Sequence, residues 1–295
     1  MAEIEERVRR LACFSEDVVV EPLAGGLTNR NFLVQSKGER FVVRMGDDNP
    51  VHLILRWHEL AAAKAGHAAG IAPEIIHAEP GALVMRHVAG RTLTPEDVAD
   101  PRRLPALIAL LKRCHIEARH HFAGPLMAFW PFHVARHYAR LINEAKGEWM
   151  GETPALLALA DRLEAGLGPV SLVFGHNDLL AANIIDDGAR LWLIDYDYAG
   201  LNSPLFDLAN LASNNGFSEE AEREMLALYF GRAPDEAMLR SYAAMRAASL
   251  LRETMWSMVS ETHSTLDFDY RAYTLDYRAR LDEAVAVFDG LNGTL

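Results

Sequence analysis

The first third of the chain alternates short apolar runs with turn residues, a pattern that predicts β-strands. Residues 3–13 are amphipathic and predict a short helix. Runs rich in β-branched residues follow, separated by a Gly-Gly pair and a Lys-Gly-Glu turn, and they lie at 18–23, 31–36 and 40–46. Apolar runs bounded by turn residues are typical of strands, so these three predict a meander.

The next segment combines helices with one further strand. Residues 57–70 are alanine-rich and stop at a glycine, which predicts a helix, and 81–90 predicts a strand that ends at Gly90. Beyond it, Thr94 can cap a helix that has proline at its first position. The apolar spacing over 104–122 predicts a second helix.

Two short β-like runs, at 170–178 and 182–197, interrupt the remaining chain, which is helical in pattern after residue 203. The outline is an α+β chain with a small β-rich N-terminal lobe and a larger, mainly helical C-terminal lobe. We place the boundary at residue 88, so that 1–88 forms the first lobe and 89–295 the second.

Composition limits the possible partners. The 295 residues are half apolar and carry a net charge of −12, without a long cluster of Lys and Arg, so nucleic acid is not expected. The first residues are charged where a signal peptide would be apolar, and apolar stretches are too short for membrane insertion. Cys13 and Cys114 form no disulfide or zinc motif. We expect a cytoplasmic protein, either a monomer or a homodimer.

Three polar residues flank the two β-like runs. Asp178 follows the first run, Asn183 precedes "IIDD", and Asp195 ends "LWLID". A hairpin would bring all three to one end. Asn183 and Asp195 then suit Mg²⁺, which takes few protein ligands and completes its shell with phosphate oxygens and water, and Asp178 is left to accept a proton. Each residue alone could instead be a turn former.

The segments "HNDLLAAN", "LIDYDYAG" and "FDLAN" resemble the catalytic core of the choline/ethanolamine kinase family, within the protein-kinase-like phosphotransferases that include aminoglycoside kinases. The resemblance covers most of the chain and implies a two-lobed protein-kinase-like fold that uses ATP and Mg²⁺. It makes Asp178 the catalytic base and Asn183 and Asp195 the Mg²⁺ ligands. Asp207 would brace the catalytic loop, and His176 would order that loop by hydrogen bonding.

The same resemblance assigns the N-terminal lobe to the nucleotide. A turn between the first two strands would cover the phosphates, because paired glycines let the backbone approach an anion. This turn contains Gly25, Gly26, Thr28 and Asn29. The hinge whose backbone binds adenine would contain Arg86, His87 and Val88. On residues alone, the Gly-Gly pair could be a simple hairpin turn.

Arg44 in "FVVRM" stands where most kinase-like proteins have a strand lysine. Its partner is predicted to be Glu59, in the helix that follows. An arginine–carboxylate pair would fix that helix and leave donors for the ATP phosphates. Without the family pattern, the two residues could be unconnected surface charges.

The acceptor site is predicted on the late helix. Glu253 and Trp256 are three residues apart and share a helix face, with Arg252 alongside. An indole ring can hold a quaternary ammonium by cation–π attraction, a carboxylate adds charge, and Tyr198 would complete the cage. Eukaryotic choline kinases have a second tryptophan where Glu253 falls and an acidic residue where Asn214 falls, and Trp256 could be an ordinary buried aromatic.

The predicted function is ATP- and Mg²⁺-dependent phosphorylation of the hydroxyl of choline or a related amino alcohol such as ethanolamine. The same fold could phosphorylate thiamine, an aminoglycoside or a sugar, because the fold does not choose the substrate. A second alternative is a catalytically inactive nucleotide-binding protein.

Overall fold

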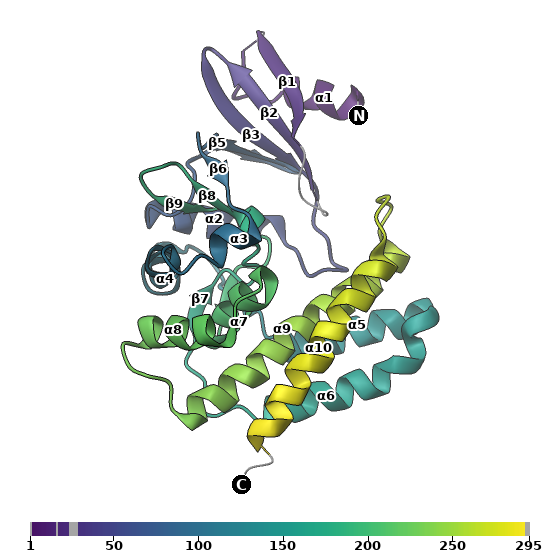
Figure 1. The fold of residues 1–295 in the computed structure, drawn as a ribbon. Helices are drawn as coiled ribbons and strands as arrows, with labels where there is room; N and C mark the ends of the chain where they lie inside the picture. The colour runs from purple at the N-terminus through teal and green to yellow at the C-terminus, as the bar shows by residue number, and fades with distance from the viewer. Residues whose placement is uncertain (1, 16, 24–28, 293–295) are drawn as a thin grey trace.

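A computed structural model describes residues 2–15, 17–23 and 29–292 and has two lobes (Figure 1). The small lobe contains an antiparallel five-stranded sheet in the order β1-β2-β3-β5-β4. Its strands are β1 (Val18–Leu23), β2 (Arg30–Ser36), β3 (Glu39–Met45), β4 (Ile75–Glu79) and β5 (Ala82–Arg86). Helix α1 (Ala2–Arg9) packs beside β1. The predicted meander is confirmed by the pairing of β1 with β2 and β2 with β3.

Alternation of side chains along the strands builds the core of the small lobe. Phe32 and Val34 on β2 and Phe41 and Val43 on β3 are buried in one hydrophobic cluster, because residues two apart on a strand share a face. The two strands are joined at Lys37 and Gly38, whose φ angles of 51° and 80° lie in the left-handed region that tight hairpins use.

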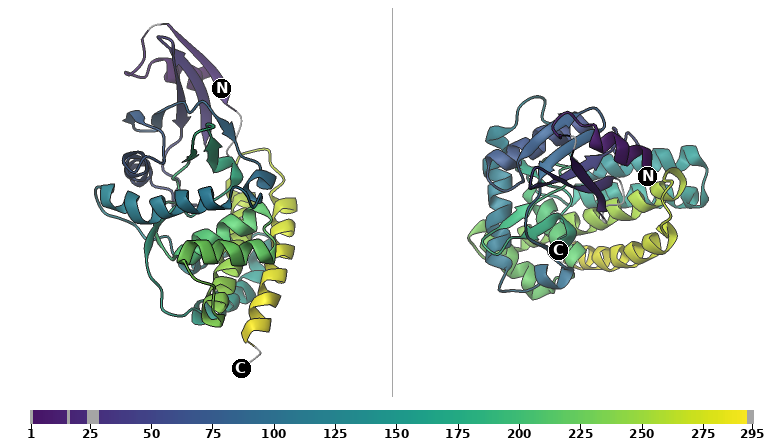
Figure 2. Two further views of the ribbon diagram at one scale, coloured as in Figure 1. Left: turned by 60° about the vertical axis from the view of Figure 1, so that its left-hand side comes forward. Right: turned by 90° about the horizontal axis from the view of Figure 1, so that it is seen from above.

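Helices dominate the large lobe, where α9 and α10 lie side by side (Figures 1 and 2). Its α-helices are α3 (Pro95–Val98), α4 (Leu104–Lys112), α5 (Pro131–Ala145), α6 (Thr153–Ala165), α7 (Pro204–Asn215), α8 (Glu219–Phe230), α9 (Glu236–His263) and α10 (Tyr270–Asn292). Short 3₁₀ turns are η2 (Ala118–His121), η3 (Glu148–Glu152) and η4 (Ala181–Asn183). The predicted two-lobed α+β fold is thus confirmed.

Two further small sheets are present. One has the order β6-β8-β9 and the other pairs β10 with β7. Their strands are β6 (Arg91–Thr92), β7 (Val173–Gly175), β8 (Ile184–Asp186), β9 (Leu191–Leu193) and β10 (Gly200–Asn202). Residues 170–178 and 182–197 therefore contain strands, as their pattern predicts.

The predicted helix over 104–122 changes type along its length. Helix α4 ends at Lys112 and continues as a π-helical turn, η1 (Arg113–Glu117), before η2 completes it. A π-turn rotates the side chains relative to a regular α-helix. It lies where Cys114 and His115 are both fully buried.

Helix α2 (Arg56–Ala68) precedes residue 88 but packs into the core of the large lobe. Its small side chains allow close approach: a Cβ on Gly66 would lie 2.5 Å from the Tyr196 hydroxyl oxygen. Ala62 and Ala65 are fully buried in the same cluster as the apolar residues of α7 and α9. The sheet and α2 therefore belong to different hydrophobic cores.

None of the helices in the described part of the chain is both long enough and apolar enough to cross a membrane.

Candidate active site

The β8–β9 hairpin brings the three predicted polar residues together. Ile184 pairs with Leu193, and the Ile194 N–H donates to the Asn183 carbonyl oxygen over 3.0 Å. Asn183 and Asp195 therefore lie at one end of the hairpin. The Asn183 amide nitrogen donates to the main-chain oxygen of Asp178 at 2.9 Å and to its Oδ2 at 3.3 Å.

Asp195 has the features expected of a ligand to a hard cation. Its φ of 64° lies in the left-handed region, which aspartate tolerates better than most residues. Its buried Oδ1 has no hydrogen-bond partner among the described residues. Burial and the nearby carboxylates of Asp197 and Asp178 raise the pKa of Asp195 well above its ordinary value. A cation at this place would pair with Oδ1 and would stabilise the ionised form of the Asp195 carboxylate. The side chains therefore fit Mg²⁺.

Few protein ligands surround this position. The described residues include no cluster of three or more His, Cys, Asp or Glu suited to hold a metal ion. Mg²⁺ is commonly held by one or two carboxylates, with phosphate and water as the other ligands. The donor set of Asn183 and Asp195 is therefore compatible with that ion.

Asp207 holds the loop that carries Asp178. Its carboxylate accepts from the main-chain N–H of His176 at 2.7 Å and of Asn177 at 2.8 Å, and the His115 ring lies 2.9 Å away. Burial would raise the pKa of Asp207, but the hydrogen bond and charge of His115 outweigh it, so this pKa is lowered. The predicted contact of Asp207 with the loop is present.

His176 connects the same loop to the hairpin. Its Nε2 lies 3.0 Å from the Ile194 carbonyl oxygen, and its ring meets that of Tyr196 at a centroid distance of 5.0 Å. Burial lowers the pKa of His176, which favours a neutral ring. These contacts agree with an ordering role.

A cavity of about 570 Å³ lies between the lobes, a size typical of small-molecule sites. Its lining includes Asn183 and Asp195 from the hairpin. The predicted nucleotide residues that line it are Asn29, Arg44, Glu59, Arg86, His87 and Val88. Gly25, Gly26 and Thr28 lie outside the described residues.

The predicted hinge has part of its backbone already engaged. The main-chain N–H of Arg86 donates to the Glu74 carbonyl oxygen over 2.9 Å, and the main-chain N–H of His87 donates to the Arg40 carbonyl oxygen over 3.0 Å. These two N–H groups are therefore already paired within the protein.

The predicted contact between Arg44 and Glu59 is present. Arg44 Nη2 lies 2.5 Å from Glu59 Oε2, and the two side chains are 7% and 3% exposed. Burial, reinforced by Asp197, raises the pKa of Glu59 to about 7, against the opposing effect of the two nearby arginines, Arg44 and Arg56. The pair is thus an internal ion pair.

Sequence reasoning missed two charges of this network. Arg56 Nη1 lies 2.8 Å from Glu59 Oε2 and 2.7 Å from Asp197 Oδ1. Asn29 accepts from Arg56 at 2.7 Å and donates to Asp197 at 3.0 Å. Two arginines and two carboxylates therefore form one buried cluster. Their spacing, with Arg56 one helical turn before Glu59 and Asp197 two residues after Asp195, was the available signal.

The predicted acceptor residues are connected through tyrosines of α10. The Tyr273 hydroxyl donates to Glu253 Oε1 over 2.8 Å, and its ring lies 6.1 Å from Trp256 between centroids. Tyr273 stacks on Tyr277, whose hydroxyl donates to Asn214 over 3.4 Å. Sequence reasoning missed both tyrosines, although their i, i+4 spacing places them on one helix face.

Arg252 occupies the space over Tyr198. Its guanidinium carbon lies 4.3 Å from the Tyr198 ring centroid, and its Nη1 lies 2.5 Å from Glu253 Oε2. The same nitrogen lies 4.0 Å from Asp178 Oδ1. Burial raises the pKa of Asp178 to about 7, although the charge of Arg252 opposes this. Tyr198, which is predicted to help hold an ammonium, therefore already has a protein cation over its ring.

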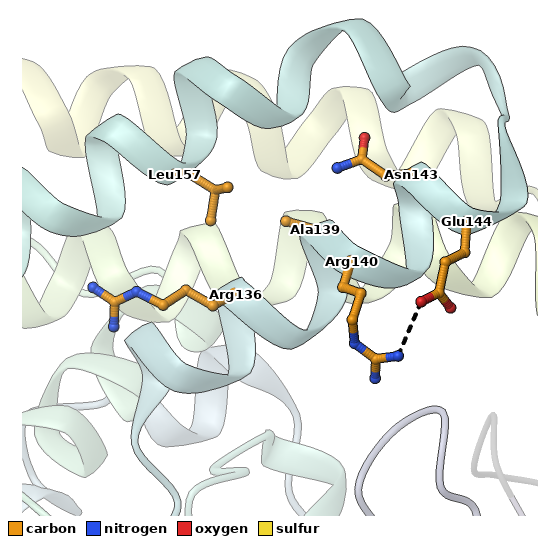
Figure 3. Close-up of a pocket in the computed structure, with 6 residues that line it drawn as sticks. All are labelled: Arg136, Ala139, Arg140, Asn143, Glu144 and Leu157. Carbon is orange, nitrogen blue, oxygen red and sulfur yellow. Dashed lines mark hydrogen bonds and ion pairs between the residues drawn. The ribbon is translucent and has the colours of Figure 1, made fainter.

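A second hollow, of about 470 Å³, lies between α5 and α6 (Figure 3). Its arginines are already paired: Arg136 lies 2.6 Å from Asp161, and Arg140 lies 3.1 Å from Glu144. Its lining contains none of the predicted site residues. The interlobe cleft is the better candidate site.

A small sheet above a helical lobe, with an aspartate, an asparagine and a second aspartate beside the intervening cleft, defines a kinase-like phosphotransferase. The chain belongs to the phosphotransferase enzyme family, whose model matches residues 19–247. The predicted phosphotransferase activity is therefore confirmed.

Relatives agree with the predicted resemblance to choline and ethanolamine kinases. Protein LicA from Haemophilus influenzae is 26% identical over 270 residues, covering 88% of this chain and 78% of that protein. Ethanolamine kinase 2 from Homo sapiens is 25% identical over 292 residues, covering 88% and 74%. The crystal structure of a choline/ethanolamine kinase family protein from Mesorhizobium loti has a TM-score of 0.78 at 25% identity, covering 96% of this chain and 94% of that one.

Proposed function

We propose that the protein transfers the γ-phosphoryl group of ATP to the hydroxyl of a small amino alcohol, the class that contains choline and ethanolamine. The observation that carries this proposal is the contact of Asp178 with Asn183, which lines the interlobe cavity together with Asp195. The names of the relatives support the choice of acceptor class.

Asp178 is the catalytic base of this proposal. The acceptor oxygen bonds to the γ-phosphorus, the bond from that phosphorus to ADP breaks, and the hydroxyl proton passes to Asp178. A base works best when its pKa lies near the working pH, and burial raises the pKa of Asp178 to about 7. Asp207 and His176 keep its loop in place through the hydrogen bonds described above.

Asn183 and Asp195 would hold Mg²⁺, which when bound supplies positive charge beside the phosphate oxygens. Arg44, oriented by Glu59, adds donors for the same phosphates. The turn at 25–29 would cover the phosphates, and the carbonyls of the hinge and the N–H of Val88 would bind adenine.

ADP release from Mg-ATP tests this function. The purified protein is assayed with choline, ethanolamine, thiamine, a sugar and an aminoglycoside. We expect an amino alcohol to stimulate release, and Asp178→Asn to lower the rate by about 10²- to 10⁴-fold, the usual contribution of a general base. The matched control is Asp161→Asn, whose side chain is 68% exposed on α6. ATP binding without release with every acceptor would instead identify an inactive nucleotide-binding protein.

A further inference from the structure

The main-chain groups on both sides of Asp178 are bonded to side chains of one helix, α7. Asp207 accepts from the N–H groups of the two residues before Asp178. After it, the N–H of Leu179 donates to Asn210 Oδ1 over 2.5 Å, and the Leu179 carbonyl oxygen accepts from Asn215 Nδ2 over 3.1 Å. Helix α7 therefore holds the chain before and after the proposed base.

The residue before Asp178 has an uncommon backbone conformation. Asn177 has a φ of 65°, in the left-handed region, which few residues other than glycine adopt. Its side chain stabilises this conformation, because Nδ2 donates to the Tyr198 carbonyl oxygen over 2.9 Å and Oδ1 accepts from Asn202 Nδ2 over 2.9 Å. Such conformations persist where the surrounding structure holds them. The bonds around Asp178 therefore maintain a backbone shape that the chain would otherwise rarely adopt.

Asn210 can hold Leu179 in only one orientation of its amide. An amide oxygen accepts hydrogen bonds and an amide nitrogen donates them, so the N–H of Leu179 requires the oxygen. The nitrogen donates to Ser249 Oγ over 3.0 Å, and this bond keeps the amide from turning over. Asn210 and Ser249 are 1% and 2% exposed, so losing either partner would leave a buried polar group unpaired.

Ser249 belongs to the helix that carries the proposed acceptor residues. It lies on α9, four residues before Glu253, and α9 packs against α7. The bonds from Leu179 to Asn210 and from Asn210 to Ser249 thus connect the loop of the proposed base to the proposed acceptor helix. The distance between that loop and α9 therefore depends on the Asn210 amide.

We propose that Asn210 is a positioning residue for phosphoryl transfer, which sets the place of Asp178 relative to α9, and that Ser249 fixes the orientation of the Asn210 amide. This inference rests on the proposed function, because it concerns the residue proposed as the base. Asn210 acts through the main chain beside Asp178, so its loss should lower kcat and leave the KM for ATP unchanged.

Asn210→Leu tests this role, because leucine has a similar shape and no hydrogen-bonding group. Activity is measured as ADP release from the full chain, with Mg-ATP and the acceptor that stimulates release most strongly. We expect kcat to fall by about 10- to 10²-fold, since a displacement of about 1 Å can cost that much, while the KM for ATP changes by less than about twofold.

A double-mutant cycle shows whether Ser249 acts through Asn210. Ser249→Ala removes the partner of the Asn210 nitrogen and should lower kcat by a smaller factor, about threefold to tenfold. In Asn210→Leu the same substitution should have almost no further effect on kcat, because the amide that Ser249 holds is gone. Losses that multiply in the double variant would overturn the role given to Ser249.

Thr153→Val is the matched control, because it also removes a buried side-chain hydrogen bond, but at the start of α6. Thr153 is 2% exposed, and its hydroxyl lies 2.9 Å from both Asn143 Oδ1 and the Met150 carbonyl oxygen. Its melting temperature should fall while its kcat stays at the parent value. Amide exchange at Leu179 should become faster in Asn210→Leu and stay unchanged in Thr153→Val.

The outcomes separate the inference from the proposed function. If Asn210→Leu is folded and its kcat falls no more than that of Thr153→Val, the inference is overturned and the proposed kinase function stands. A rise in the KM for ATP as large as the fall in kcat also overturns it, because the loss is then general. If Asn210→Leu does not fold, the same comparison of kcat and KM is made with Ser249→Ala. If no acceptor stimulates ADP release from the parent although ATP binds, the proposed function fails and the inference fails with it.

Discussion

Arg56 and Asp197 lie 2.7 Å apart, from Nη1 to Oδ1, and connect the first turn of α2 to the segment after β9. Their side chains are 14% and 3% exposed, and Glu59 and Arg44 complete the cluster. Two positive and two negative charges thus balance one another. Removing one of them would leave an uncompensated buried charge.

The first prediction concerns this balance. Arg56→Met should lower the free energy of unfolding by about 3–5 kcal/mol, the usual cost of removing one partner of a buried pair. Urea unfolding measures it. Arg102→Met is the matched control, because Arg102 pairs with Asp100 while 89% exposed, and its loss should cost less than about 1 kcal/mol. Equal losses in the two variants would contradict a special role for the buried cluster.

The second prediction is a pH dependence of catalysis. Only the ionised carboxylate of Asp178 can accept a proton, and the pKa of Asp178 is raised to about 7. We expect kcat/KM to be low in acid, to rise through about pH 7 and then to level off. Arg252 opposes the rise of this pKa, so Arg252→Met should move the midpoint to higher pH. A rate that stays flat down to pH 5 would exclude Asp178 as the base.

The ionisation of Asp178 also affects stability. Catalysis requires the ionised carboxylate, whereas folding favours the protonated form. The pKa of Asp178 in the folded protein lies above the ordinary value of 3.8, so the folded state binds more protons between about pH 4 and pH 7. Stability should therefore fall as pH rises through this window. Asp178→Asn cannot ionise at this position, so its free energy of unfolding in urea should lose this part of the pH dependence. A difference in unfolding free energy between variant and parent that stays constant with pH would contradict the raised pKa of Asp178.

The third prediction separates the proposed nucleotide end of the cleft from the proposed acceptor end. Glu59→Gln weakens the ion pair that orients Arg44, so the KM for ATP should rise by about tenfold, equivalent to about 1.4 kcal/mol. The KM for the acceptor should change little. A larger effect on the acceptor would place the pair elsewhere in the mechanism.

The fourth prediction concerns the loop that carries Asp178. Asp207→Asn replaces a carboxylate that accepts from two main-chain N–H groups and His115, and should cost about 2–3 kcal/mol of stability. The pKa of Asp207 is lowered by folding, so its contribution is present above the ordinary pKa near 3.8 and is lost as pH falls further. Faster amide exchange at His176 and Asn177 would show that the loop is released, and unchanged exchange would contradict the bracing role.

Local sequence patterns were sufficient for the hairpin part of the site. Asn183 and Asp195 flank two strands that are close in sequence, so their spacing and apolar pattern predict that they meet. The strands of the small lobe were predictable for the same reason, since each side chain's face follows from its position.

Contacts between distant segments could not be predicted in this way. Arg56 and Asp197 are 141 residues apart, and their pairing depends on how α2 packs against the large lobe. Arg252 looked like a neighbour of the acceptor residues, and only the packing of α9 shows that it covers Tyr198. The π-turn that contains His115 has no sequence pattern of its own, because apolar spacing there still matches a helix.

The packing of α2 has a mechanical consequence. Its alanines fix Glu59 to the helical lobe, whereas Arg44 belongs to the sheet, so their ion pair connects two bodies with separate cores. A displacement of the sheet away from the helical lobe would separate Arg44 from Glu59, and the reverse displacement would bring the two together. The width of the cleft and the placement of Arg44, the arginine that we propose binds the phosphates, would therefore change together.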